Sequence, residues 1–221
     1  MRFDCIIFDL DGTVLYTIKD LADSINYSLI KNGLVPCSFE TVHKYICADS
    51  KTFYLNCLRA ENKGLSPDKE DACYRDFQSY YKIHMADNTS PYEGVPELLK
   101  RLRYAGIPTA VISNKNNAAA NRIIDICLPG FFTAVIGEGE GLRPKPYPDM
   151  YLHLKNALAF SSPVYVGDSE FDLRFAASVG CPSIGVSYGY RDRAVLENEN
   201  SAIYIADSVS QLENFLFEDL T

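Results

Sequence analysis

The sequence predicts an α/β fold, in which a doubly wound parallel sheet carries an inserted α-helical segment after its first strand. Two observations predict it. From residue 91 onward, short apolar runs alternate with helical patterns, which is typical of parallel strands joined by crossover helices. The first apolar run, Cys5 to Phe8, is separated from the others by roughly 70 residues of helical pattern, the length of a small domain.

The first strand is expected at residues 5–8, because a short apolar run there ends in the turn sequence Asp9-Leu10-Asp11-Gly12-Thr13. A helix is expected next, since apolar residues recur at spacings of three and four from residue 18 to residue 29. Ser66-Pro67 indicates the start of a longer helix, because serine caps helix N-termini and proline fits the first turn.

The second part of the chain provides the remaining strands and helices. Strands are expected at 107–112, 132–136, 164–166, 183–186 and 202–205. Helices are expected at 116–127, 148–158 and 170–179, and a last one opens with a capping box formed by Ser208 and Gln211. We therefore expect an α/β core made of residues 1–15 and 89–221, and a helical cap at residues 16–88.

Composition narrows the function classes. The formal net charge of −8 disfavours binding to nucleic acid or to anionic membranes. Seven scattered cysteines, without a CxxC pair, indicate reduced thiols rather than a disulfide framework or a zinc site. The sequence shows neither a signal-peptide pattern nor an apolar stretch of membrane-spanning length, so a cytoplasmic protein is expected.

Four polar clusters follow predicted strands, and the carboxyl ends of parallel strands share one edge of a sheet, where ligands bind. Each cluster alone also has a structural interpretation: turn aspartates, a helix N-cap, a loop lysine, and acidic residues at a helix start. Together the carboxylates form an oxygen-rich site suited to Mg²⁺. The clusters are Asp9 with Asp11, Ser113-Asn114-Lys115, Lys145 between two prolines, and Asp168 with Asp172.

This ordered set resembles the four motifs of haloacid dehalogenase-like phosphatases, and within them the phosphoglycolate phosphatase group. The resemblance implies a Mg²⁺-dependent phosphatase in which Asp9 is the nucleophile and forms an aspartyl-phosphate. It implies that Asp11 is general acid and then base, and that Asp9, the Asp11 carbonyl and Asp168 hold the metal. Ser113, Asn114 and Lys145 would bind the phosphoryl oxygens, with Asp172 orienting Lys145 or metal-bound water.

The cap is expected to select the leaving group, because the core motifs contact only the phosphoryl group that all substrates share. Residues 44–52 form either a polar lid contact or a solvated loop, and Lys51 within them is a candidate substrate contact. Tyr16 is a second candidate, at a position where the family commonly has an Asp-Ser pair. That departure leaves the substrate open and the core chemistry unaffected.

Other activities also fit the motifs. A phosphomutase of the same superfamily would return the phosphoryl group to a sugar, and a pyrophosphatase would cleave pyrophosphate. A non-enzymatic binding protein is disfavoured, because all motif carboxylates are present. The expected partner is a small phosphorylated metabolite, and the expected assembly is a monomer or a homodimer.

Overall fold

The structure, a computed structural model, describes residues 2–46 and 49–218. The chain divides into two compact units, one made of Met1–Tyr16 with Pro91–Thr221 and the other of Thr17–Ser90. The sequence placed the inserted segment at 16–88, within two residues of the second unit at either end.

The larger unit is built on a six-stranded sheet in the order β5-β4-β1-β6-β7-β8, and its neighbouring strands run parallel. This arrangement confirms the α/β fold predicted from the alternation of apolar runs and helical patterns. The strands are β1 (Cys5–Phe8), β4 (Thr109–Asn116), β5 (Ala134–Glu138), β6 (Pro163–Gly167), β7 (Ser183–Val186) and β8 (Ala202–Ala206).

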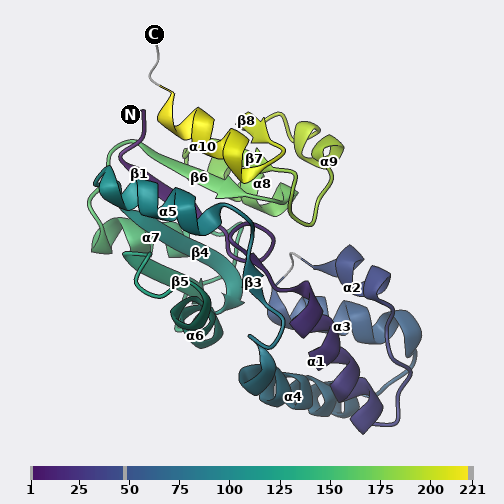
Figure 1. Ribbon diagram of the computed structural model, residues 1–221. Helices are drawn as coiled ribbons and strands as arrows, with labels where there is room; N and C mark the ends of the chain where they lie inside the picture. The colour runs from purple at the N-terminus through teal and green to yellow at the C-terminus, as the bar shows by residue number, and fades with distance from the viewer. Residues whose placement is uncertain (1, 47–48, 219–221) are drawn as a thin grey trace. The chain divides into compact units, whose positions relative to one another are not determined.

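Helices cover both faces of this sheet, which is why β1 is buried along its whole length. Cys5 and Ile7 pack on one face with residues of α7 (Asp149–Ala157) and α8 (Glu170–Ser178). On the other face lie α5 (Val95–Tyr104) and α10 (Val209–Phe217), which contact each other (Figure 1). The strand order reverses at β1, since β4 and β5 lie on one side of it and β6, β7 and β8 on the other. Open α/β sheets bind their ligands at such a position.

The end of β4 differs from the prediction. The strand was expected to end at residue 112, but β4 continues to Asn116, where it pairs with Glu138 of β5 after a register shift, so the alternative interpretation of Ser113 and Asn114 as a helix cap is wrong. The helix α6 (Asn117–Cys127) is capped by Asn116, whose side chain accepts from the Ala119 N–H. Backbone pairing with β5 thus keeps residues 113–115 in the strand.

The capping box expected at the last helix is only half formed. The Ser208 side chain accepts from the Gln211 N–H, as a capping serine does. The Gln211 side chain, however, accepts from the Asp207 N–H at 2.8 Å instead of the Ser208 N–H. The helix α5 was not predicted, and neither were three short elements: α9 (Arg193–Glu197), and the two-stranded sheet of β2 (Leu15–Tyr16) and β3 (Ser90–Pro91).

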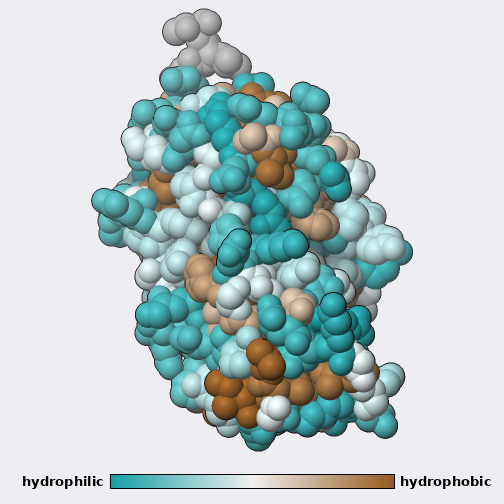
Figure 2. Space-filling view, turned by 90° about the vertical axis from the view of Figure 1, so that its right-hand side faces the viewer, coloured by the Kyte–Doolittle hydropathy of each residue, from teal (hydrophilic) through white to brown (hydrophobic). Residues whose placement is uncertain are grey.

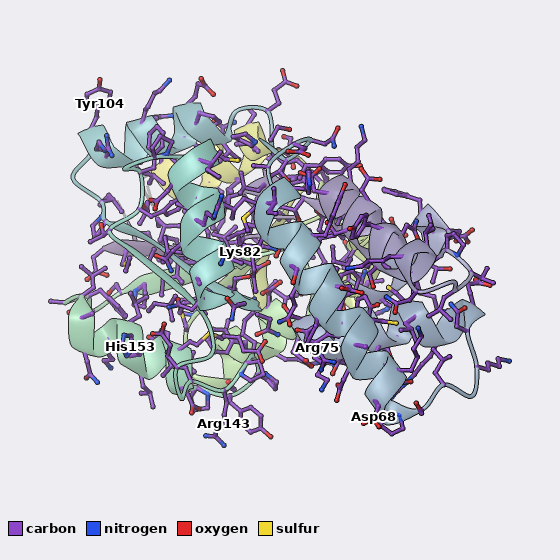
Figure 3. All side chains as sticks on the ribbon, turned by 90° about the horizontal axis from the view of Figure 1, so that it is seen from below. Asp68, Arg75, Lys82, Tyr104, Arg143 and His153 are labelled. Carbon is purple, nitrogen blue, oxygen red and sulfur yellow. The ribbon has the colours of Figure 1, made fainter. Side chains whose placement is uncertain are left out.

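The smaller unit consists of the helices α1 (Ile18–Lys31), α2 (Phe39–Tyr45), α3 (Ser50–Glu61) and α4 (Pro67–His84). α4 begins as predicted, with Ser66 accepting from the Lys69 N–H and Pro67 in the first turn. Its outer side carries charged residues seven positions apart, among them Asp68, Arg75 and Lys82 (Figure 3). Its inner side buries Cys73, Phe77 and Tyr81, so α4 is amphipathic at the helical period.

A buried carboxylate joins the two ends of this unit. Asp20 in the first turn of α1 is 2% exposed and accepts hydrogen bonds from Asn88 and Thr89. Both backbone N–H groups and both side chains take part, at 2.8 to 3.0 Å. The carboxylate is therefore satisfied by neutral donors, and it fixes residues 88 and 89 against the start of α1.

The surface is largely hydrophilic on the face shown in Figure 2, where apolar residues gather mainly in one area toward its lower end. Exposed apolar side chains of the smaller unit include Ile30, Val35, Phe39 and Ile83. Within the described part of the chain, none of the helices combines the length and the apolar composition that crossing a membrane requires.

Candidate active site

The site is centred on three aspartates at the carboxyl ends of β1 and β6. These strands are neighbours, with Phe8 opposite Val166, so the residues that follow them emerge side by side. The Asp9 N–H donates to the Val166 carbonyl at 2.8 Å, which fixes the first of these turns against the second strand. Ligand oxygens of Asp9, Asp168 and Asp172 lie within 4.8 Å of one another, and all three residues are buried.

Lys145 joins two of these carboxylates. Its Nζ donates to Asp9 Oδ1 and to Asp172 Oδ1, both at 2.6 Å, and to the Tyr165 hydroxyl at 3.1 Å. Burial alone would lower the pKa of the Lys145 ammonium, but the charges of Asp172 and Asp9 outweigh it and hold the pKa well above its ordinary value. Lys145 is therefore a permanent positive charge next to the proposed nucleophile.

Asn114 positions Lys145 through its backbone. The Asn114 side chain accepts from the Lys145 N–H at 2.6 Å and donates to the Lys145 carbonyl at 3.4 Å. Ser113 is 2% exposed at the same strand end, where its hydroxyl accepts from the Lys115 N–H. The structure thus places Ser113 and Lys145 at one edge of the sheet, and it gives Asn114 a supporting contact to the lysine loop.

Hydrogen bonds orient Asp168 and Asp172 from outside the cluster. Asp168 accepts from the Thr13 hydroxyl at 3.2 Å through Oδ1 and from the Tyr190 N–H at 2.7 Å through Oδ2. Asp172 forms a capping box with Ser169 at the start of α8, which holds its Oδ2, while Oδ1 faces Lys145. Each carboxylate therefore has a fixed direction, which is how supporting contacts prepare a metal site.

The charges of this cluster fit a bound cation. Burial raises the pKa of Asp9 to about 7, and Lys145 offsets only part of that effect. Burial, together with the charge of Asp172, also raises the pKa of Asp168 well above its ordinary value. Buried carboxylates this close together stay ionised at neutral pH when a cation compensates them. Three carboxylate oxygens at such spacing suit Mg²⁺. The group includes Asp172, which the sequence analysis expected to orient Lys145 or metal-bound water and not to bind the metal directly.

Asp11 is oriented away from this cluster. Both of its carboxylate oxygens accept from Lys115 Nζ, at 2.9 and 3.0 Å, and its side chain keeps 18% exposure. Its carboxylate is not part of the three-aspartate group, so any metal contact of Asp11 is left to its backbone carbonyl. A carboxylate that is partly open and lies two residues from the proposed nucleophile is placed to exchange a proton with a leaving group.

The two further candidates lie in different units. Tyr16 is 38% exposed in the larger unit, and its ring packs near the rings of Tyr92 and Tyr190, with centroids 6.0 and 6.4 Å away. Lys51 lies in α3 of the smaller unit and pairs with Asp71 at 2.9 Å. Of the segment 44–52, residues 47–48 lie outside the described residues. Substrate contacts by Tyr16 and Lys51 remain predictions.

Sequence reasoning assigned no role to Lys115, Tyr165 and Tyr190. Tyr165 is a strand residue whose hydroxyl donates to the Ile112 carbonyl and contacts Lys145, but in the sequence it resembles any core aromatic. Tyr190 acts through its backbone, which no sequence pattern reveals. Lys115 did carry a signal, because it directly follows Ser113-Asn114 at a strand end.

Comparisons with known proteins agree with this geometry. The sequence model of the haloacid dehalogenase-like hydrolase family matches residues 6–186. A phosphoglycolate phosphatase of Mesorhizobium japonicum is 30% identical over 204 residues, which cover 90% of this chain and 88% of the relative. A phosphoglycolate phosphatase of Caulobacter vibrioides is 32% identical over 196 residues, 86% of this chain and 81% of the relative.

Solved structures show the same fold along nearly the whole chain. A candidate phosphoglycolate phosphatase from Lactobacillus delbrueckii subsp. bulgaricus has a TM-score of 0.91 at 28% identity, covering 99% of this chain and all of that one. A predicted phosphoglycolate phosphatase from Haemophilus somnus has a TM-score of 0.89 at 26% identity, covering 98% and 97%. The resemblance stated on the four motifs is therefore confirmed.

Proposed function

The chain belongs to the haloacid dehalogenase-like hydrolase family, and we propose that it is a Mg²⁺-dependent phosphatase acting on a small phosphate monoester of the phosphoglycolate kind. The observation that carries the proposal is the arrangement around Lys145. Its ammonium lies 2.6 Å from both Asp9 and Asp172, within the cluster that also contains Asp168. The Asp9 carboxylate is thus held next to a fixed positive charge, and that charge can also bind an anionic phosphoryl group.

In the first step, an Asp9 carboxylate oxygen attacks phosphorus, and the bond from phosphorus to the ester oxygen breaks. Asp11 gives a proton to the departing oxygen, which leaves as an alcohol. The product is an aspartyl-phosphate on Asp9, so one difficult displacement is divided into two easier ones. In the second step, Asp11 takes a proton from water, the water oxygen attacks phosphorus, and Asp9 is regenerated with release of phosphate.

Two groups bind the phosphoryl oxygens while this happens. Lys145 supplies a charge-assisted contact from the side of Asp9 and Asp172. The Ser113 hydroxyl, on the part of the adjoining strand β4 that extends past the end of β1, supplies a second donor. Asp9 and Asp172 hold the Lys145 ammonium, and the Ser113 hydroxyl accepts from the Lys115 N–H, so both groups are oriented before the substrate arrives.

Asp9, Asp168 and the Asp11 carbonyl would hold the Mg²⁺, with Asp172 available as a further oxygen donor. When bound, the ion supplies the positive charge that lets a carboxylate approach a phosphate dianion. Asp9, Asp11, Asp168 and Asp172 face Lys115 and Lys145, so this set carries two more negative than positive charges when all are ionised. A phosphate group would otherwise be repelled.

A cytoplasmic location forms part of the same proposal. Six cysteines of the described chain form no disulfide, and five of them are buried, which suits a reducing compartment.

The test is to assay the purified protein on 2-phosphoglycolate, pyrophosphate and a hexose phosphate, with Mg²⁺ and with excess chelator. We expect Mg²⁺-dependent release of phosphate from 2-phosphoglycolate. Release from pyrophosphate alone would indicate a pyrophosphatase, and turnover that requires a sugar bisphosphate activator would indicate a mutase. Full activity in chelator would exclude the metal-dependent mechanism.

A matched pair of variants locates the nucleophile. Asp9→Asn should abolish turnover and prevent labelling of the protein by a substrate carrying radioactive phosphate. Asp125→Asn makes the same change on the exposed side of α6 and should retain both. Labelled phosphoenzyme recovered from Asp9→Asn would remove Asp9 from this role.

A further inference from the structure

Lys115 is a buried ammonium next to the proposed acid. Its side chain is 5% exposed, and its Nζ donates to both carboxylate oxygens of Asp11 at 2.9 and 3.0 Å. It reaches this position because β4 lies beside β1, with Val111 opposite Phe8, and continues past the end of β1. In the proposed function Lys145 binds the phosphoryl oxygens, and Lys115 has no contact with the substrate assigned to it.

The distances place Lys115 on the leaving-group side of the site. An acid that protonates a leaving oxygen lies about 3 Å from it. Since Lys115 Nζ is 2.9 to 3.0 Å from the Asp11 oxygens, it lies at most about 6 Å from that leaving oxygen. A carboxylate one carbon away from the leaving oxygen extends about 3 Å, from bond lengths near 1.5 Å. Such a carboxylate can therefore contact the ammonium while Asp11 contacts the ester oxygen.

Charge favours that arrangement. As the proposed acid, Asp11 carries a proton while it contacts the leaving oxygen, so Lys115 then faces a neutral carboxyl group instead of a carboxylate. A nearly buried ammonium whose carboxylate partner has become neutral loses a charge-assisted contact. A substrate that brings a carboxylate replaces the lost contact, whereas a neutral alkyl leaving group does not.

We propose that Lys115 determines specificity by binding the carboxylate of the leaving group, so that the preferred substrates are phosphate esters of small 2-hydroxy acids. This inference depends on the proposed phosphatase function. It adds a residue and a charge requirement that the phosphoryl-binding groups do not supply, because they contact only the part shared by all monoesters.

The experiment compares 2-phosphoglycolate with ethyl phosphate, which has the same two-carbon skeleton without the carboxylate. Wild-type protein should prefer 2-phosphoglycolate in kcat/KM. Lys115→Met should reduce kcat/KM on 2-phosphoglycolate at least tenfold more than on ethyl phosphate, about the effect of one charge-assisted hydrogen bond. Lys115→Arg keeps the charge and should retain most of the preference. Lys155→Met, an exposed lysine of α7, is the matched control and should leave the ratio unchanged.

Each outcome supports or overturns the inference. Equal losses on both esters would mean that Lys115 acts only through Asp11, and a retained preference in Lys115→Met would mean that the carboxylate binds elsewhere. A wild-type protein that hydrolyses both esters equally would overturn the specificity inference and leave the phosphatase function standing. Hydrolysis of neither ester would overturn the phosphatase function itself.

Discussion

Gly189 lies where a methyl group has no room, and replacing it tests how Asp168 is oriented. A Cβ at this position would lie 2.3 Å from the Gly12 carbonyl oxygen and 2.4 Å from Asp168 Cβ, where carbon atoms normally approach to about 3.5 Å. The segment around it must therefore shift by about 1 Å. Its neighbours hold the site: the Tyr190 N–H donates to Asp168 Oδ2, and the Tyr188 hydroxyl donates to the Thr13 carbonyl at 3.1 Å.

A shift of that size breaks the 2.7 Å bond from the Tyr190 N–H to Asp168. Losing a contact that orients a metal ligand weakens metal binding by about 10–100-fold, and overpacking costs about 1–3 kcal/mol of stability. We expect Gly189→Ala to fold and to raise the dissociation constant for Mg²⁺ by that factor, measured by isothermal titration calorimetry without substrate.

Gly106→Ala is the control for this measurement. Gly106 has φ 72° and open space around it, so alanine there should cost stability through backbone strain and leave Mg²⁺ affinity unchanged. If Gly189→Ala binds Mg²⁺ as tightly as wild type, the segment 187–190 does not orient the metal ligand and the reasoning fails.

Three further predictions concern the proposed chemistry. Asp11→Asn should impair hydrolysis of an alkyl phosphate about tenfold more than that of p-nitrophenyl phosphate, because only a poor leaving group needs protonation; equal loss in steady-state assays would contradict its role as acid. Without metal, the folded protein should lose stability as pH rises from about 4 to about 7, since Asp9 holds its proton there and the unfolded chain does not. The increase in Tm on adding Mg²⁺ should therefore be larger at pH 8 than at pH 5. Equal increases at the two pH values would refute the raised pKa of Asp9 in the metal-free protein. Tyr16→Ala or Lys51→Ala should change kcat/KM for the best substrate about tenfold relative to an aryl phosphate, and equal effects on both would exclude a specificity role.

The sequence predicted the strands well where an apolar run is bounded by turns. β7 was located to the residue, because Ser183 to Val186 are buried on both faces and follow a proline. It failed at the end of β4, where Ser113 to Lys115 are polar and Lys115 contacts Asp11 of the site. Polar residues after an apolar run resemble a helix cap, and only pairing with β5 shows that the strand continues.

The candidate site, like the fold, could be predicted from the sequence only in part. That Asp9, Asp168, Asp172 and Lys145 lie close together could be predicted, because they belong to the ordered set of four motifs. The ion pair of Lys115 with Asp11 could not, since it joins residues 104 positions apart and depends on the register of β4 against β1. The contact of Tyr190 with Asp168 uses a backbone N–H, which carries no sequence information.

The bonds from Asp20 to Asn88 and Thr89 also bear on the order of folding. β1 and β4 pair at Ile6 and Thr109, so this parallel contact closes a loop of 103 residues. Once the helical unit has formed and Asp20 holds residue 88, the open chain between the two strands shortens to about 35 residues. The logarithmic dependence of closure entropy on length makes that shortening worth about 1 kcal/mol. When the insertion folds first, it thus lowers the entropy cost of pairing β1 with β4.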